Sequence, residues 1–266
     1  MRETGCPICG NSRNRIFGDI GSSRVVTCRG CGLFYRNPIP NRQDLIARIK
    51  NSPQYTNDQL NKVQFFRNRA SNLFDRIEAI IPPGRVLDIG CSIGTELVVG
   101  REHGWDCTGI ELSDSSVEIA RSQGLRIIQA ELEEAKLPDD SFDMITVNHM
   151  LEHVSDPGPL LREVRRILRS EGLLFISVPN VHAWQCYLRK QNYSWTFHDD
   201  HFIHFSTETL ALLLQKYVFT ILDLYTSRWR DFHDDLGMHS FIFKIINGLI
   251  ERAGLGIEIF CLAKKV

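Results

Sequence analysis

From residue 85 onward, short apolar runs alternate with segments whose apolar residues recur every three or four positions. The short runs predict strands at 85–89, 106–110, 126–130, 142–148, 173–178, 219–226 and 256–263. The longer segments predict amphipathic helices at 95–103, 114–123, 157–169, 207–217 and 240–253. Strands that alternate with helices predict a doubly wound α/β fold with a mostly parallel, seven-stranded sheet.

The chain before residue 85 follows a different pattern. Residues 1–40 are rich in cysteine and arginine, residues 41–61 are mostly polar, and an amphipathic helix is expected to follow, with Val63, Phe66, Ala70, Leu73, Phe74, Ile77 and Ile81 on its apolar face. We therefore expect a small module at 1–40, a helical linker at 41–84 and a main domain at 85–266. Within the main domain, an irregular insertion at 181–205 follows the fifth strand.

The cysteines of the first segment form two Cys-x-x-Cys pairs, Cys6 with Cys9 and Cys28 with Cys31, separated by 18 residues. This spacing is typical of two knuckles that place four thiolates around a zinc ion, because each pair turns tightly and a glycine follows it. Disulfides would need a secretory context that the sequence does not suggest. Four thiolates leave no position for water, so we expect a structural zinc ribbon.

Overall charge and composition exclude some classes of protein. The 266 residues carry a formal net charge of −1 and are 43% hydrophobic, which is enough for one large core plus a small module. The first fifty residues are different, because nine basic residues against three acidic ones give them a formal charge of +6. The sequence shows neither a signal peptide nor a run long enough to span a membrane, so we expect a cytoplasmic protein.

A glycine-spaced turn follows the first strand of the main domain. Val86–Thr95 runs from an apolar strand through Gly90 and Gly94 into a helix, and Glu111 follows the next strand. Glycines let the backbone bend tightly and approach a ligand, and an acid about 20 residues further on can accept ribose hydroxyls. The pattern predicts a nucleoside cofactor. The third glycine that a pyrophosphate needs is absent, which favours a cofactor without phosphates.

Five motifs in order within 85–180 resemble the class I S-adenosylmethionine-dependent methyltransferases. They are the glycine turn, Glu111, the segment that starts at Glu131-Leu132, Asn148–Val154, and Gly172–Asn180. The resemblance implies a Rossmann-like methyltransferase fold that binds S-adenosylmethionine. The cofactor-binding residues it implies are Asp88, Gly90, Cys91, Ser92, Gly94, Glu111, Leu112, Glu131, Leu132 and Asn148.

Ligand chemistry suggests a role for each of these groups. The turn should offer carbonyls and amides to the methionine end of the cofactor, with Asp88 orienting it, and Glu111 should accept from the ribose diol. Glu131 should accept from the adenine amine, with Leu132 beside the ring, and Asn148 should lie near the methionine portion. The neighbouring acids Glu133 and Glu134 fit a solvated charge run.

Methyl transfer to a hydroxyl or a carbon acid needs a base, and histidine suits that role near neutral pH. The candidates are His201 first, His149 second and His153 third, the last also fitting a packing role in its loop. The aromatic residues of the insertion could bind a planar or sugar acceptor, or could form a local core. The spacing of His198, His201 and His204 also raises a second metal site, but no cysteine or well-spaced set of carboxylates accompanies them.

A four-cysteine ribbon ahead of such a domain resembles bacterial enzymes that methylate sugars or other small metabolites. The sugar C-methyltransferases among them have a further carboxy-terminal domain that this sequence lacks, which favours O-methylation. An alternative is a ribosomal RNA base methyltransferase whose basic ribbon binds RNA. The near-neutral net charge of the whole chain argues against this alternative. A third interpretation is a non-catalytic S-adenosylmethionine-binding partner of another enzyme. The sequence does not indicate the oligomeric state.

Overall fold

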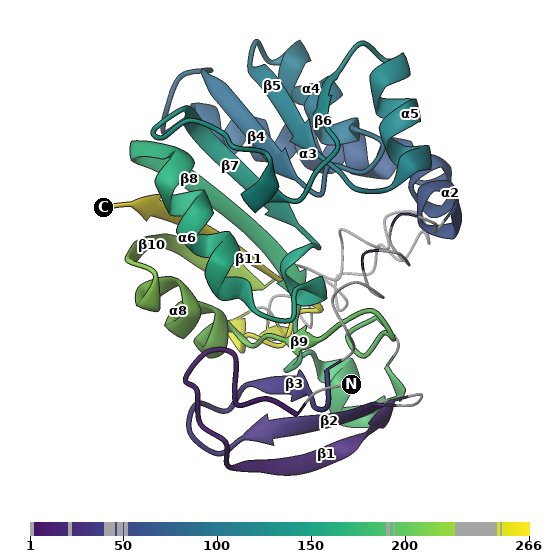
Figure 1. Ribbon diagram of the computed structural model, residues 1–266, viewed down its shortest axis with the longest axis vertical. Helices are drawn as coiled ribbons and strands as arrows, with labels where there is room; N and C mark the ends of the chain where they lie inside the picture. Colours follow the sequence, from purple (N-terminus) through teal and green to yellow (C-terminus); the bar gives the residue numbers. More distant parts are fainter. Residues whose placement is uncertain are drawn as a thin grey trace. The chain divides into compact units, whose positions relative to one another are not determined.

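The computed structural model describes residues 3–20, 23–39, 46, 50, 53–189, 192–193, 195–226, 249–250 and 252–266. Its main feature is a seven-stranded sheet with the strand order β10-β11-β8-β7-β4-β5-β6 (Figure 1). The strands are β4 (Arg85–Ile89), β5 (Asp106–Ile110), β6 (Arg126–Ile128), β7 (Phe142–Asn148), β8 (Leu168–Pro179), β10 (Phe219–Thr226) and β11 (Glu258–Lys265). The pairs β4–β5, β4–β7 and β5–β6 are parallel. The predicted α/β fold is confirmed.

The chain divides into two compact units. The glycine-loop unit contains Asn41–Asn148, Pro159–Phe175 and Lys265–Val266. The cysteine unit contains Met1–Pro40, His149–Gly158 and Ile176–Lys264. The segment predicted as a separate module at 1–40 therefore belongs to the same unit as most of the chain after β8.

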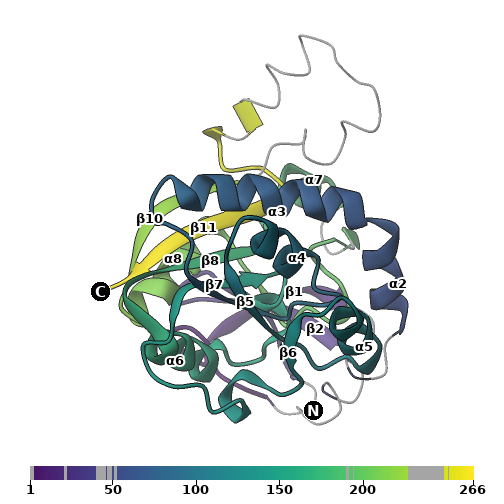
Figure 2. The ribbon, with the colours of Figure 1, turned by 90° about the horizontal axis from the view of Figure 1, so that it is seen from above.

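The helices of the glycine-loop unit are α2 (Pro53–Asn61), α3 (Val63–Glu78), α4 (Thr95–Glu102), α5 (Asp114–Ser122) and most of α6 (Pro157–Ile167). Those from α3 onward follow the predicted periodicity, and α2 falls in the segment expected to be a helical linker. The apolar face of α3 is buried through Ala70, Leu73, Phe74 and Ile77. Figure 2 shows α3 beside α4, and a Cβ atom on Gly100 of α4 would come within 2.6 Å of the Phe74 ring. Close packing of these helices therefore depends on a glycine at that position.

A small antiparallel sheet organises the cysteine unit. Its strand order is β1-β2-β3-β9, formed by β1 (Asn14–Ile20), β2 (Ser23–Cys28), β3 (Phe34–Arg36) and β9 (Ile203–His204). Two described helices, α7 (Trp184–Arg189) and α8 (Thr207–Lys216), also belong to this unit. Because β9 comes from the insertion and pairs with β3, the insertion completes the sheet of the four-cysteine segment.

The largest difference from a predicted boundary lies between α6 and β8. Helix α6 ends at Ile167, and β8 begins at Leu168 rather than at residue 173. Leu168 is fully buried, so burial in the sheet outweighs the helical periodicity at this position. The helix expected at 240–253 lies largely outside the described residues. Within the described part of the chain, no helix combines the length and apolar character needed to cross a membrane.

Candidate functional site

The turn between β4 and α4 contains three residues with positive φ, at 79° for Gly90, 50° for Ser92 and 80° for Gly94. A Cβ atom on Gly94 would lie 2.3 Å from Cδ1 of Leu125, so both backbone conformation and packing require glycine there. The amides of Gly90 and Cys91 donate to the carbonyl of Ile110 at 2.8 and 3.0 Å. Gly94 is the N-cap of α4, whose first amides have no partners within the helix and can serve a ligand.

Glu111 connects this turn to the segment that follows β5. Its Oε2 accepts from the amide of Ser92 at 2.9 Å, and its Oε1 accepts from the amides of Leu112 and Ser113, both at 2.7 Å. The side chain is buried, so these three amides fix its position. A carboxylate offers about four acceptor positions, and Glu111 therefore retains capacity for a further donor such as a ribose hydroxyl.

Two acids lie close to the turn, Asp88, which is buried, and Glu96, which is half-buried. Oδ1 of Asp88 accepts from Oγ1 of Thr146 at 2.8 Å, and Oε2 of Glu96 accepts from Nδ2 of Asn148 at 2.6 Å. Burial raises the pKa of Asp88 well above its ordinary value, and the negative charge of Glu96 raises it further. Burial also raises the pKa of Glu96. Among the described residues, Oε1 of Glu96 is buried without a hydrogen-bond donor. This arrangement suits a ligand with a positive charge.

Glu131 and Leu132 lie just after β6. Glu131 is half-buried at the N-cap of a single 3₁₀ turn, Leu132–Glu134, and Leu132 is buried. Glu133 and Glu134 are exposed, as a solvated charge run would be. The structure therefore separates the two predicted ligand residues from the two acids beside them, and their contact with adenine stays a prediction.

Sequence analysis missed Glu96 and Thr146. An acid in the first turn of a helix is common, because it interacts favourably with the helix dipole, so Glu96 carries no special signal in the sequence. Thr146 lies within a β-branched strand where threonine is ordinary. Only burial and pairing with Asn148 and Asp88 distinguish them from such residues.

In the cysteine unit, His149 contacts two carboxylates. Its Nε2 lies 2.6 Å from Oε1 of Glu258, and its Nδ1 lies 3.3 Å from Oε1 of Glu152. Burial lowers the pKa of His149, but the two acids outweigh this effect and raise it to about 9. An imidazolium with both nitrogens engaged does not accept a proton, so the geometry does not favour His149, the second of the three histidines expected as a base.

His153 and His201 are placed differently, with their rings 4.8 Å apart and nearly perpendicular. Nδ1 of His153 lies 2.9 Å from the carbonyl oxygen of Asp200, and Nδ1 of His201 lies 2.9 Å from that of Thr196. A carbonyl can only accept, so each Nδ1 carries the hydrogen, and in the neutral imidazole Nε2 keeps its lone pair. Burial lowers the pKa of His201 well below its ordinary value, and the charge of His153 lowers it further. His201 is therefore neutral at pH 7.

The other two histidines of the three-residue spacing, His198 and His204, do not join this pair. Nδ1 of His204 donates to the same Thr196 carbonyl at 2.9 Å, and burial lowers the pKa of His204 to about 3. His198 is exposed. The three-residue spacing therefore does not bring His198, His201 and His204 together as one set of ligands.

The phenylalanines of the insertion are buried, and Phe197 packs in a local core. Phe197 is buried in a cluster with Ile20, Val25 and Ile257, and it stacks on Phe17 of β1 at 5.3 Å between ring centroids. The rings of Phe202 and Phe205 are also buried, whereas Tyr187 is exposed. Of the two interpretations of these aromatics, the local core is the one that these contacts support for the phenylalanines.

Arg36 of β3 connects the four-cysteine segment to the turn that precedes His201. Its backbone amide donates to the carbonyl of Phe202 at 2.8 Å, and its buried guanidinium donates to the carbonyls of Asp199 and Ile20. A planar guanidinium with several donors suits such a position between carbonyl groups. The four-cysteine segment therefore helps to fix the position of His201.

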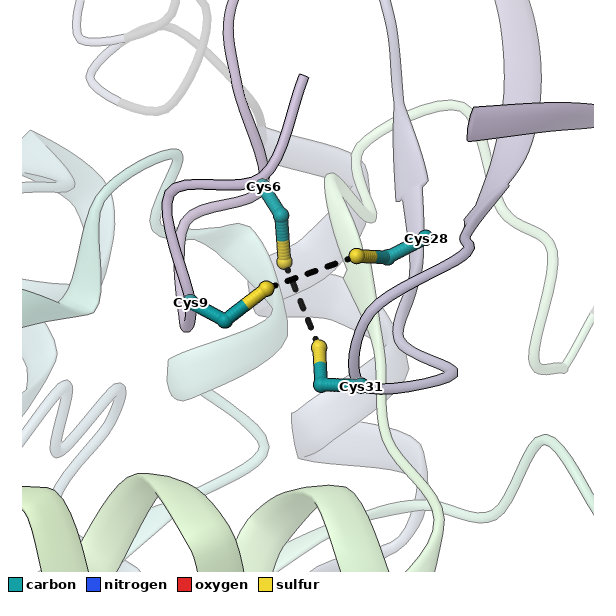
Figure 3. A group of neighbouring side chains, drawn as sticks. All are labelled: Cys6, Cys9, Cys28 and Cys31. Carbon is teal, nitrogen blue, oxygen red and sulfur yellow. Dashed lines mark hydrogen bonds between the residues drawn. The ribbon is translucent and has the colours of Figure 1, made fainter. Parts of the chain in front are cut away.

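Figure 3 shows that the four cysteine side chains point toward one another. Sγ of Cys6 lies 3.5 Å from that of Cys31, and Sγ of Cys9 lies 3.5 Å from that of Cys28. All four are free thiols, and their sulfur atoms lie within 4.8 Å of one another. Zinc–sulfur bonds of about 2.3 Å in a tetrahedron place the sulfurs about 3.8 Å apart, so the cluster fits a zinc ion.

The fold and the glycine-loop unit define a class of enzyme. A family model described as a methyltransferase domain matches residues 63–224. A solved S-adenosylmethionine-dependent methyltransferase of Thermotoga maritima superposes with a TM-score of 0.62 at 19% identity, over 84% of this chain and 100% of that one. The chain therefore belongs to the methyltransferase domain family.

Curated relatives resemble part of the chain. The ubiquinone biosynthesis O-methyltransferase of Histophilus somni is 31% identical over 135 residues, which are 46% of this chain and 53% of the relative. The enzyme of the same name from Bordetella avium is 36% identical over 104 residues, which are 36% of this chain and 43% of the relative. The chain thus spans about half the length of these relatives or less, and the alignments do not identify its methyl acceptor.

Proposed function

We propose that the protein methylates a hydroxyl group of a small molecule, with a sugar or a related metabolite as the acceptor class. The observation that carries this proposal is the pair of His153, which is half-buried, and His201, which is buried. Nδ1 of each ring donates to a backbone carbonyl, and Nε2 can receive a proton. A hydroxyl is a weak acid, so its methylation needs a group that accepts the hydroxyl proton. The names of the O-methyltransferase relatives support the same reaction class.

S-adenosylmethionine supplies a methyl group on a positively charged sulfur. In our proposal Glu111 accepts from the ribose diol, and the buried Oε1 of Glu96 accepts from the ammonium group. The amides that begin α4 donate to the carboxylate of the methionine end. Asn148 positions Glu96, because its amide donates to the other carboxylate oxygen.

On the acceptor side, His201 takes up the hydroxyl proton or holds the group that removes it, and His153 lies beside it. Arg36 keeps the preceding turn in place through the carbonyl of Asp199. The enzyme gains rate mainly from the alignment of the acceptor oxygen with the methyl carbon and from exclusion of water. The carboxylates at His149 hold that ring as a fixed cation beside Glu152.

We further propose that the four cysteines hold one structural zinc ion. The amide of Gly30 donates to Sγ of Cys28 at 3.3 Å, as backbone amides do in knuckles that stabilise thiolates, and Gly10 and Gly32 have the positive φ that such turns need. The zinc stabilises a sheet that is too small to rely on its own core. Reduced thiols of this kind are typical of the cytoplasm, where we place the protein.

The test uses S-adenosylmethionine with a radiolabelled methyl group, incubated with the purified protein and fractionated cell extract. We expect label in small molecules, in a linkage with the stability of an ether rather than of an ester or amine. A panel of sugars with free hydroxyl groups then narrows the acceptor. Label in RNA would instead support the ribosomal RNA alternative, and binding without transfer to any fraction would support a non-catalytic partner.

A further inference from the structure

His153 and His201 lie next to the carboxylate of Glu152, a residue outside the insertion. Glu152 precedes His153 in the chain, and both meet His201 across the fold. One ligand atom from each residue, a carboxylate oxygen and two ring nitrogens, lies within 4.8 Å of the others. We infer that Glu152, His153 and His201 form a second metal site, distinct from the four cysteines, that binds a divalent transition-metal ion.

Hydrogen bonds to the two imidazoles prepare both rings for a metal. Nδ1 of His153 donates to the carbonyl oxygen of Asp200, and Nδ1 of His201 donates to that of Thr196, both at a nitrogen–oxygen distance of 2.9 Å. Nε2 of each ring is therefore the ligand atom. Histidines bound to metals commonly donate their other N–H to a carbonyl or a carboxylate, and this bond sets the tautomer and the orientation of the ring. The second layer of a metal site is therefore already in place.

Glu152 provides a second, independent observation. The residue is 1% exposed, and its Oε2 is buried without a hydrogen-bond donor among the described residues. Its Oε1 forms an ion pair with Nδ1 of His149 at 3.3 Å. Buried carboxylates normally use their oxygens in hydrogen bonds, ion pairs or metal bonds, so Oε2 has the capacity to bind a further cation.

The ligand set indicates the type of ion. Two imidazoles and one carboxylate with open positions suit Fe²⁺, Mn²⁺, Co²⁺ or Zn²⁺, whereas a four-thiolate cluster selects Zn²⁺. Bonds of about 2.1 Å bring ligand atoms to within about 4.2 Å of one another, so the widest pair here has to close by less than about 1 Å. The amide of Phe202 donates to the carbonyl of Glu152 at 2.7 Å. This bond holds the backbone next to His201 beside the backbone of Glu152 and His153.

A use for the ion in catalysis rests on the proposed function. A hydroxyl bound to a divalent cation loses its proton to water more readily. The oxygen then forms its bond to the methyl carbon as the carbon–sulfur bond breaks, and the electron pair of that bond stays on sulfur. His201 would act as a ligand in this scheme, and the cation would replace a free imidazole as the group that favours loss of the proton.

Mn²⁺ is the probe that separates the two metal sites, because it binds thiolates poorly and leaves a zinc-loaded ribbon intact. Protein that retains one zinc per chain is titrated with Mn²⁺, and the signal of the free ion is followed by electron paramagnetic resonance. We expect one Mn²⁺ per chain, with affinity at least tenfold lower in Glu152→Gln and in His201→Gln. His198→Gln, an exposed histidine of the same insertion, is the matched control and should bind Mn²⁺ like the wild type.

A second measurement covers the case in which the variants unfold. Electron spin echo spectra of Mn²⁺ bound to the wild-type protein should show couplings to directly bound imidazole nitrogens, and their absence overturns the inference. Equal Mn²⁺ affinity in folded Glu152→Gln and wild type overturns it as well. If Mn²⁺ binds as described but no hydroxyl acceptor is methylated, the metal site stands and the proposed function fails. If a hydroxyl acceptor is methylated at the full rate and the protein binds no Mn²⁺, the proposed function stands and the inferred metal site is overturned.

Discussion

The two units of the chain bury their charged groups in different ways. In the glycine-loop unit, Asp88, Glu96 and Glu111 lie among backbone amides and two neutral donors, Thr146 and Asn148. In the cysteine unit, histidines lie against carboxylates and carbonyls. In the proposed function the first arrangement serves a cationic cofactor and the second serves the acceptor. We therefore expect that a variant in one unit can change its own step without changing the other.

Loss of a cysteine ligand is the strongest test of this separation. Metal binding contributes on the order of 10 kcal/mol to folding in small zinc modules, so Cys28→Ser should expose the sheet of residues 3–39. We expect loss of amide protection there by hydrogen exchange, and loss of methyl transfer, with S-adenosylmethionine affinity by calorimetry unchanged. Cys107→Ser in the glycine-loop unit is the control. If Cys28→Ser weakens cofactor binding as well, the two halves do not act separately.

His201→Gln tests the acceptor side alone. Removal of a group that receives or organises a proton transfer lowers the rate by about 10² to 10⁴-fold. We expect kcat to fall by this amount in a labelled-methyl assay, while S-adenosylmethionine binds with its original affinity. His198→Gln should keep the wild-type rate, because His198 is exposed. A rate for His201→Gln within a factor of two of the wild type would remove this residue from the proposed mechanism.

Glu111→Ala tests the cofactor side. It removes the proposed ribose acceptor and leaves the amides of Ser92, Leu112 and Ser113 without their carboxylate. We expect cofactor affinity to fall about 100-fold, or about 3 kcal/mol, with unfolding still cooperative. Glu118→Ala, which changes an exposed acid on α5, provides the comparison in the same calorimetric experiment. Unchanged affinity in Glu111→Ala would refute the ribose assignment.

Arg36→Met should have a smaller effect on the acceptor side. The variant keeps an unbranched apolar stem but removes the guanidinium that donates to the carbonyls of Asp199 and Ile20. We expect kcat/KM for the acceptor to fall about tenfold, the size of one lost buried hydrogen bond, with zinc content unchanged. Arg24→Met removes only an exposed ion pair with Asp19 and should leave kcat/KM as it is. Equal effects in both variants would exclude a positioning role for Arg36.

The smallest effect concerns pH on the cofactor side. Burial raises the pKa values of Asp88 and Glu96 above their ordinary 3.8 and 4.5, so these acids take up protons earlier than exposed acids as the pH falls. Affinity for a cationic cofactor should therefore decrease from neutral pH toward pH 4. Glu96→Gln should flatten this dependence and weaken binding roughly three- to tenfold at pH 7.

The same pair gives an opposite prediction for stability. A group with a raised pKa in the folded state favours folding below its unfolded pKa, and this contribution is lost as the pH rises through the raised value. Glu96→Gln should therefore raise the free energy of unfolding at pH 7, measured by denaturant titration without cofactor. If the variant is less stable than the wild type at pH 7, Glu96 is satisfied in the free protein and is not held for a ligand.

Much of the glycine-loop unit could be predicted from the sequence. Gly90, Gly94 and Glu111 act through backbone conformation and short loops, and such local effects leave a local signature. Glu96 was not predicted as a site residue because its partner Asn148 lies 52 residues away in the chain. The cysteine unit was harder, since the spacing of Cys6, Cys9, Cys28 and Cys31 revealed a cluster but gave no sign that β3 would pair with β9.

The sequence by itself determined the methyltransferase family, the order along the chain of the seven strands of the main sheet, and the four-cysteine cluster, because each depends on residues close together in the chain. Tertiary structure alone decided which histidines keep a usable nitrogen. His149 and His153 are four residues apart, yet two carboxylates engage the first and a carbonyl orients the second. Burial and partners from distant segments set those states, and only the folded chain brings Glu152, His153 and His201 together.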